Sequence, residues 1–400
     1  MITNPRTLEQ FDAEYLAKHK PRASIRKIRK LLPKIRHRTK HAGDWPFNPK
    51  GLMVDLVSNN ISMKDSKFQA TFLDWMETPD YNKFLNKESG EFVYAQVAKR
   101  GNVPYVIRKS DKMKSLSDAI EGKIFDHPLP GFRDRRMTRL LLITLTFDQK
   151  QFTPEKAWAS LRSKPIEGVE TSYNLLNKLN ANISKIFGKH GTLISKEAQS
   201  NGYPAPHIIV VLDKPVMVKR HIGKDGYVSW RLCDPCILNR IGKGDLMRKL
   251  YRDNPRSAIS KNPIWKNGFI DFEGVVSEEG SKSGRDATRY TFKYLVKSVT
   301  EDGAFCIKDC NDISSVDNKS LRTMLFTHLG NKCFRTRDVS FGKGFKERIG
   351  MLPEAPKVSS DSVWKRIRTV NQFEYNWIQA YNQAVSTVKP TNPLQKEAIT

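Results

Sequence analysis

Leu140-Leu-Leu-Ile-Thr-Leu-Thr-Phe147 is the stretch of this 400-residue chain that indicates a buried strand. Its β-branched and apolar content and its length are typical of such a strand. Side chains two residues apart on a strand point to the same face, so Thr144 and Thr146 share one face. The stretch therefore predicts a buried strand that carries two hydroxyl groups side by side.

Two more strands follow about fifty residues later. Thr192-Leu-Ile-Ser-Lys-Glu197 and Gly202-Tyr-Pro-Ala-Pro-His207-Ile-Ile-Val-Val-Leu212 read as strand, polar connection and strand. In a hairpin of these two, Glu197 and His207 lie near facing ends. A histidine and a carboxylate at a sheet edge can hold Mg²⁺ or Mn²⁺, which can polarise a scissile phosphate. The alternative is a satisfied histidine beside a surface glutamate.

A helix is expected between the first strand and the hairpin. Thr153-Pro-Glu155 has the residue types of a helix start, and the segment 172–187 places Leu175, Leu179, Ile183 and Ile186 on one apolar stripe. Such a crossover helix is typical of an α+β domain. The predicted fold is a central antiparallel sheet backed by helices, with a basic N-terminal accessory region and a helical C-terminal region.

Tyr290-Thr-Phe-Lys-Tyr-Leu-Val-Lys297 carries the strongest indication of chemistry. Helical geometry places Tyr290 and Tyr294 one turn apart on one face. A phenol has a pKa of about 10 and reacts at neutral pH only with positive charge or a metal-polarised phosphate beside it. Lys293 and Lys297 could supply that charge. The alternative is an amphipathic helix with packed tyrosines and solvated lysines.

In this order, the Thr-x-Thr strand, the Gly-x-Pro-x-x-His strand and the Tyr-x-x-x-Tyr-x-x-Lys helix resemble the three motifs of HUH endonucleases. Among these the resemblance is specifically to rolling-circle replication initiators of small plasmids and single-stranded DNA phages, and it runs from about Arg139 to Lys297. The stretches 264–271 and 334–342 also look familiar in that setting. The resemblance implies a metal-dependent nickase and strand transferase acting on single-stranded or cruciform origin DNA.

The resemblance assigns roles to the tyrosines. Tyr294 matches the nucleophile that attacks a DNA phosphate, forms a 5′-phosphotyrosyl link and frees a 3′-hydroxyl primer. Tyr290 matches the second tyrosine of two-tyrosine members. Many single-tyrosine plasmid initiators carry a glutamate at that position, so Tyr290 points to alternating attack by two tyrosines.

The metal motif departs from the family, which has His-hydrophobic-His where this chain has one histidine. Ala205 stands at the first histidine position if His207 is the second, and Ile209 stands at the second if His207 is the first. Either alignment leaves His207, Glu197, phosphate oxygens and water for a Mg²⁺ or Mn²⁺ ion. A hard ion such as Mg²⁺ tolerates a water-rich shell, so weak binding is expected. Asp271 and Glu273 are reserve ligands, or else the polar face of a strand.

The charge agrees with a nucleic-acid partner. The chain has 69 Lys and Arg against 42 Asp and Glu, a net charge of +27. The excess is densest in the segment 20–38, which reads as a basic amphipathic arm, a disordered tail or a solvated helix. The DNA contacts expected there and in a basic turn at 133–139 are Arg26, Lys27, Arg29, Lys30, Arg133, Arg135 and Arg136.

Three segments are expected: a basic arm and accessory domain at 1–130, an endonuclease domain at 131–300, and a C-terminal completion of the core with a helical tail at 301–400. The tail helix is placed at 361–385, where Lys365, Arg366 and Arg368 could form a DNA-contacting face. No P-loop motif occurs, so a host helicase and a replicative polymerase are expected partners. No signal peptide or membrane span is visible, which indicates a cytoplasmic protein without a membrane partner.

Two alternatives use the same motifs. An HUH transposase or relaxase would apply the chemistry to another element, and a degenerate origin-binding regulator would bind without cutting. The five cysteines are too few for a disulfide scaffold. Cys233, Cys236, Cys306 and Cys310 are either free thiols or a four-thiolate zinc site.

Overall fold

The structure is a computed structural model of the whole chain. The residues whose structure is described are 49–99, 105, 115, 116, 118, 119, 123, 125–224, 226, 228–240, 264–276, 319–351 and 363–387. The chain divides into two compact units. The smaller is built from Met1–Pro46, Trp75–Lys99 and Lys357–Thr400, and the larger from Phe47–Asp74 and Arg100–Pro356. These units group the chain differently from three contiguous segments.

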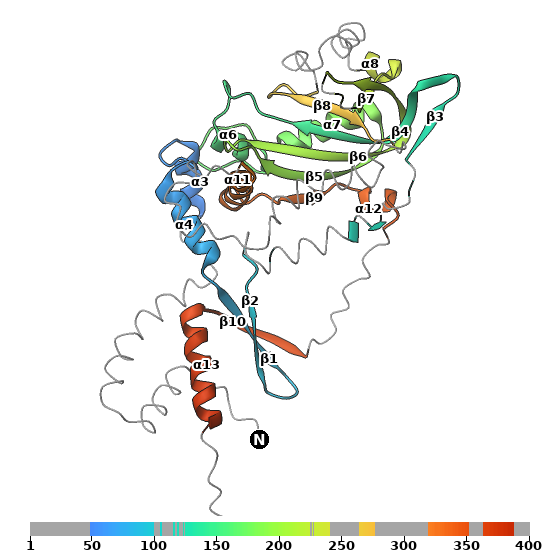
Figure 1. Ribbon diagram of the computed structural model, residues 1–400. Helices are drawn as coiled ribbons and strands as arrows, with labels where there is room; N and C mark the ends of the chain where they lie inside the picture. Colours follow the sequence, from blue (N-terminus) through green and yellow to red (C-terminus); the bar gives the residue numbers. More distant parts are fainter. Residues whose placement is uncertain are drawn as a thin grey trace, which may run out of the picture. The chain divides into compact units, whose positions relative to one another are not determined.

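The larger unit contains a seven-stranded sheet in which all neighbours are antiparallel (Figure 1). The strand order is β3-β4-β8-β7-β6-β5-β9, and β4 also pairs with β6. The strands are β3 (Asp126–Leu129), β4 (Phe132–Leu145), β5 (His190–Ala198), β6 (Pro204–Ile222), β7 (Val228–Leu232), β8 (Ile270–Gly274) and β9 (Val339–Phe341). The predicted antiparallel sheet with helices is therefore confirmed.

Helices accompany this sheet. They are α3 (Pro49–Val57), α4 (Ser66–Glu77), which runs into the smaller unit, α6 (Pro154–Ser160), α7 (Leu175–Phe187), α8 (Pro235–Arg240), α11 (Lys319–Cys333) and α12 (Phe345–Arg348). The predicted crossover helix is α7, whose stripe of Leu175, Leu179, Ile183 and Ile186 is buried. Thr153 caps α6 as predicted, with its hydroxyl accepting from the Lys156 amide.

The two faces of the sheet have different covers. On one face, Leu140, Leu142, Leu193, Ile209 and Val211 form a core with Leu116, Phe125, Phe345 and Ile349. On the other, α7 packs its apolar stripe, and the rings of Phe187 and Phe272 lie 5.9 Å apart. Burial on both faces explains why the strand at 140–145 reads as a continuous apolar run.

The edge of β5 that faces away from β6 is covered by strand β9 and helix α11. Leu193–Ser195 pairs with β9, and the next bonds along the edge run from the Lys196 amide to the Asp338 carbonyl and from the Ala198 amide to the Thr327 hydroxyl on α11. Helix α11 lies so close to α6 that a Cβ added at Gly330 would overlap the Trp158 ring. An edge covered in this way cannot pair with another chain.

The predicted basic turn at 133–139 is wrong, because these residues belong to β4. The turn lies just before them at Pro130–Gly131, where Gly131 has a φ of +79° that suits glycine. Pairing of β4 with β3 and β6 extends the strand well beyond its apolar segment. Alternating charged side chains on a hairpin look like a basic turn when only composition is considered.

The smaller unit contains a three-stranded antiparallel sheet of order β10-β1-β2 and helix α13. Its elements are β1 (Asp80–Asn86), β2 (Phe92–Gln96), β10 (Trp364–Asn371) and α13 (Gln372–Thr387). The predicted helix at 361–385 is therefore wrong at Trp364–Asn371 and confirmed from Gln372 onward. Trp364, Ile367 and Val370 have helical spacing, but pairing with β1 across nearly 300 residues holds this segment as a strand.

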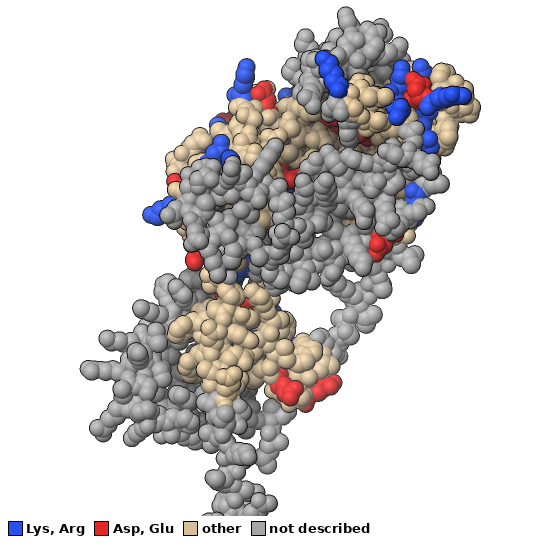
Figure 2. Space-filling view, in the orientation of Figure 1, with Lys and Arg blue, Asp and Glu red and all other residues tan. Residues whose placement is uncertain are grey.

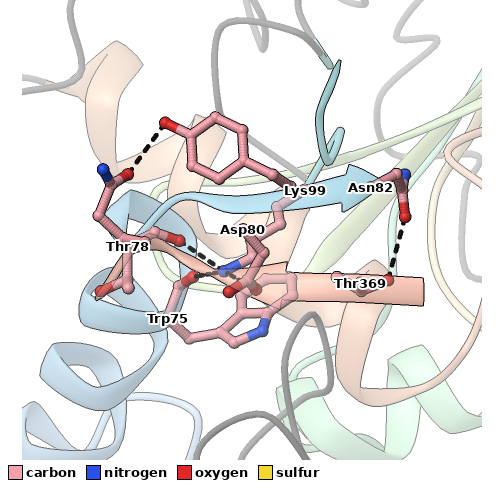
Figure 3. Close-up of polar contacts among 8 residues, drawn as sticks. Trp75, Thr78, Asp80, Asn82, Lys99 and Thr369 are labelled. Carbon is pink, nitrogen blue, oxygen red and sulfur yellow. Dashed lines mark hydrogen bonds and ion pairs between the residues drawn. The ribbon is translucent and has the colours of Figure 1, made fainter. Parts of the chain in front are cut away.

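A buried ion pair anchors the start of β1. Lys99 Nζ lies 2.7 Å from Asp80 Oδ2, and both side chains are almost fully buried. The same ammonium donates to the carbonyl oxygens of Trp75 and Thr78, as Figure 3 shows. Full hydrogen bonding of this kind is what makes a buried charge tolerable. None of the described helices is long and apolar enough to cross a membrane.

Candidate active site

A row of polar side chains crosses four strands of the larger sheet, near the end of β4 and the start of β6. Register pairs Asp271 on β8 with Thr144 on β4, Thr144 with His207 on β6, and His207 with Ser195 on β5. Directly opposed residues of antiparallel strands project to the same face. The row lies on the same face as Leu142, Ile209 and Leu193. On each of these strands, the polar residue stands two positions from the apolar core residue.

Glu197 lies beside this row and contacts His207. His207 Nε2 lies 3.4 Å from Glu197 Oε2, and their side chains are only 10% and 9% exposed. The contact arises because Glu197 pairs with Ala205, one step diagonal from His207 on the same face. The predicted meeting of the two side chains in a hairpin is confirmed, and the prediction of a surface glutamate is not.

Thr144 supports His207 from the neighbouring strand. Its Oγ1 lies 3.3 Å from His207 Nδ1, on the ring edge away from Glu197. When Nδ1 carries the proton and donates it to Thr144, the lone pair of Nε2 faces the carboxylate. A partner of this kind fixes the tautomer and orientation of a metal-binding histidine.

The register also distinguishes Ala205 from Ile209. Ala205 lies on the same face as His207 and opposite Glu197, whereas Ile209 is 1% exposed in the apolar core. Of the two positions compared with the His-hydrophobic-His motif, Ala205 is therefore the one that lies at the polar site. At that site the carboxylate of Glu197 lies beside His207.

Ser195 is a site residue that the sequence analysis missed. It is fully buried, and its Oγ has no hydrogen-bond partner among the residues that the structure describes. It faces His207 across the β5–β6 pair. An unpaired buried hydroxyl costs free energy, so such a group is expected to meet a ligand or water. Its place two residues before Glu197 is the one signal that could have drawn attention to it.

Asp271 is held by an arginine. Arg231 Nη1 on β7 lies 2.6 Å from Oδ1 and 2.7 Å from Oδ2 of Asp271. A carboxylate with both oxygens bound in this way is a poor reserve ligand, although the pair places a partly exposed guanidinium at the end of the polar row. Glu273 lies opposite Arg231 in the β7–β8 pairing, so the polar-face reading of this strand is favoured.

Thr146 has a different role from Thr144. It lies one residue beyond the end of β4, where its Oγ1 accepts from the Phe269 amide and its carbonyl accepts from Trp265 Nε1. Gly268 lies against the same backbone, and a Cβ there would overlap the Thr146 carbonyl. Thr146 therefore fixes the segment before β8 rather than touching His207.

The predicted basic contacts on β4 are unequal. Arg136 pairs with buried Asp126 at 2.7 Å, Arg135 stacks over the Phe132 ring at 4.5 Å, and Arg133 is exposed. Figure 2 shows Lys and Arg side chains with an acidic neighbour at this end of the sheet. Of the three, Arg133 is best placed to reach a phosphate, and Arg136 acts within the fold.

The other predicted site residues lie outside the described residues. They are Tyr290, Lys293, Tyr294 and Lys297 of the tyrosine segment and Arg26, Lys27, Arg29 and Lys30 of the basic arm. Cys306 and Cys310 lie outside them too. Burial raises the pKa of the Cys233 thiol to about 11, which keeps it neutral at pH 7 in the metal-free protein.

The donor set suits a weakly held hard ion. Among the residues that the structure describes, no group of three or more His, Cys, Asp and Glu side chains gathers as a metal site. His207 and Glu197 converge, and the unpaired Ser195 hydroxyl adds an oxygen donor. Two strong ligands and a hydroxyl leave room for water and phosphate oxygens, as Mg²⁺ prefers.

Comparisons with protein-family profiles, with curated proteins and with solved structures found no match to this chain. The site is therefore interpreted from its own geometry.

Proposed function

We propose that the protein is a rolling-circle replication initiator of the HUH endonuclease type, which nicks and rejoins single-stranded origin DNA of a plasmid or virus. One observation carries the proposal: His207 and Glu197 converge on one face of an antiparallel sheet, with Thr144 holding the far side of the imidazole. The motif order in the sequence supplies the nucleophile. The proposal includes Mg²⁺ or Mn²⁺ as the ion and a host helicase and polymerase as partners.

The reaction is a transesterification. The phenol oxygen of Tyr294 attacks the phosphorus, a P–O bond to tyrosine forms, and the bond to the 3′ oxygen breaks. The phenol proton passes to solvent, and the leaving oxygen takes up a proton to become the 3′-hydroxyl primer. Tyr290 performs the second transfer by the same exchange, so no water is consumed.

The described residues contribute positioning and charge. His207 and Glu197 would hold a Mg²⁺ or Mn²⁺ ion, which when bound would polarise the scissile phosphate. Thr144 keeps His207 Nε2 directed at the site, and Ser195 offers its hydroxyl to the ion or to a phosphate oxygen. Lys293 and Lys297 are proposed to lower the pKa of the attacking phenol by their charge.

The test is adduct formation on a denaturing gel. The protein is incubated with Mn²⁺ and a labelled single-stranded library of its native element, and the attached tyrosine is mapped by mass spectrometry. Tyr294→Phe should abolish the adduct, because its only change is loss of the attacking oxygen. Tyr290→Phe should retain the first cut and lose strand closure. An adduct that survives both substitutions would overturn the proposed nucleophiles.

A second function has one observation in its favour. Ala205 stands where the family has an imidazole, so a regulator that binds the origin without cutting is also considered. Under this alternative, origin DNA is bound but no adduct forms in Mg²⁺ or Mn²⁺. Ala205→His is the informative variant, since an adduct that appears only with this substitution assigns the wild-type chain to binding alone.

A further inference from the structure

Among the described residues, the two faces of the sheet in the smaller unit differ in their surroundings. Tyr375 of α13 stacks on Tyr81 at 3.9 Å and meets Tyr94 edge-on at 5.5 Å, so the helix covers the face that holds these two tyrosines. On the opposite face, which we call the open face, Lys99 lies against Asp80. Beyond that point the side chains of this face are exposed or half-buried, and they include Asn82, Phe84, Val93, Trp364, Arg366 and Thr369.

This open face combines apolar surface with a fixed guanidinium. Trp364 is 40% exposed, and it stands two residues before Arg366 on β10, so both project to the same side. Val93 on β2 lies on the same face, opposite Phe84, and is 46% exposed. A concentration of this kind marks a binding surface.

Arg366 is held flat by a hydrogen-bonded triad. Its Nε donates to Asn82 Oδ1 at 3.0 Å and its Nη2 to Thr369 Oγ1 at 2.7 Å. The Thr369 hydroxyl in turn donates to Asn82 Oδ1 at 3.0 Å, the bond drawn in Figure 3. Arg366 makes two of these three bonds, and the third joins its two acceptors. The triad fixes the plane of the guanidinium before any partner arrives.

The charge of this face favours an anionic partner. Asp80 is neutralised by Lys99, and Glu374 is buried beside Arg368 on the covered face. The exposed acids of the sheet, Glu88 and Glu91, lie on the β1–β2 turn. Arg366 is the basic side chain of β10 on this face, because its neighbour Lys365 projects to the other face. A planar arginine beside an exposed indole is a typical platform for unstacked bases, which bring phosphates with them.

We propose that the open face of the β10-β1-β2 sheet binds single-stranded nucleic acid, with a base stacked on Trp364 and the Arg366 guanidinium contacting a neighbouring base or phosphate. The inference stands independently of the nicking chemistry, because no metal, tyrosine or histidine takes part. It assigns the smaller unit the role of binding an unpaired strand without strong sequence preference.

The test uses the full chain, EDTA and a labelled oligothymidylate, read by fluorescence anisotropy. Salt is held at about 0.3 M, where purely electrostatic binding by basic segments is weakened and stacking persists. Trp364→Ala should weaken affinity by roughly fivefold or more, and Arg366→Ala should act in the same direction. The matched control is Phe92→Ala, which removes a ring of similar exposure, 43%, from the opposite face.

A second measurement locates the strand. An oligonucleotide with bromodeoxyuridine should cross-link under ultraviolet light to Trp364 or Phe84, as mapped by mass spectrometry. Affinity equal to wild type in both Trp364→Ala and Arg366→Ala, with no cross-link on this face, overturns the proposal. Loss of self-association in Trp364→Ala with unchanged DNA affinity also overturns it, because the face would then bind a second copy of the chain.

Discussion

The two sheets of this protein are both antiparallel, but they differ in which polar and aromatic side chains they bury or expose. The larger sheet buries the His207–Glu197 pair, whose side chains are only 10% and 9% exposed. The smaller sheet exposes Trp364 and Arg366 on an open face and buries its ion pair at one end. A buried polar group favours chemistry on one positioned atom, whereas an exposed aromatic surface favours contact with many bases.

This contrast suggests a division of labour in the proposed initiator. The larger unit would hold the ion and the scissile phosphate, and the smaller unit would hold the unpaired strand. Substitutions in the first should change the reaction at saturating DNA, and substitutions in the second should change the amount of DNA needed. The following variants, from the largest expected effect to the smallest, are designed to separate the two.

His207→Ala removes the imidazole that faces Glu197. We expect the rate of nicking in Mn²⁺ to fall by at least about 100-fold, because loss of a ligand should exceed the 10- to 100-fold effect of second-shell partners. Binding of single-stranded DNA should stay close to wild type. Thermal unfolding of the variant serves as the control for folding, and full nicking activity in a folded His207→Ala protein would refute the metal assignment.

Lys99→Ala leaves Asp80 buried without its partner. Removing one member of a buried pair costs about 3 to 5 kcal/mol, so the smaller unit should unfold at lower temperature than in the wild type. The double variant Asp80→Asn with Lys99→Met should recover part of this loss. Calorimetry that finds Lys99→Ala as stable as the wild type would show that the pair contributes little to this sheet.

Thr144→Val keeps the shape of the side chain and removes the hydroxyl near His207 Nδ1. We expect the Mn²⁺ concentration that gives half-maximal nicking to rise by roughly tenfold, with a smaller change in the rate at saturating Mn²⁺. Thr146→Val is the matched control, because its hydroxyl bonds a backbone amide away from His207. Equal responses in the two variants would remove the positioning role of Thr144.

Arg366→Lys keeps the charge of the open face and loses the planar fork. Lysine cannot reproduce both bonds to Asn82 and Thr369, so affinity for oligothymidylate should fall by a factor of about two to five, less than for Arg366→Ala. Anisotropy titrations at fixed salt measure this difference. A lysine variant that binds as tightly as the wild type would reduce the role of Arg366 to charge alone.

The sequence predicted the larger sheet better than the smaller one. Runs such as 140–147 and 202–212 form strands because their apolar content allows burial on both faces, and the pairing of their neighbours in the chain brings Glu197 to His207. The unpaired Ser195 and the Arg231–Asp271 pair depend on register across four strands, which local patterns do not specify.

The smaller sheet shows what local patterns miss. Its strand β10 has apolar residues at helical spacing, and the partner that makes it a strand, β1, lies nearly 300 residues earlier. Tertiary pairing of this range overrides propensity. The division of the chain into two units follows from that pairing, since it joins 75–99 with the C-terminal segment.

Adduct yield as a function of DNA concentration, measured in saturating Mn²⁺ for wild type, His207→Ala and Trp364→Ala, tests the division of labour most directly. We predict that His207→Ala lowers the plateau and leaves the half-saturating DNA concentration unchanged, whereas Trp364→Ala raises that concentration and reaches the wild-type plateau. A wild-type plateau in His207→Ala, or a lost plateau in Trp364→Ala, would contradict the account.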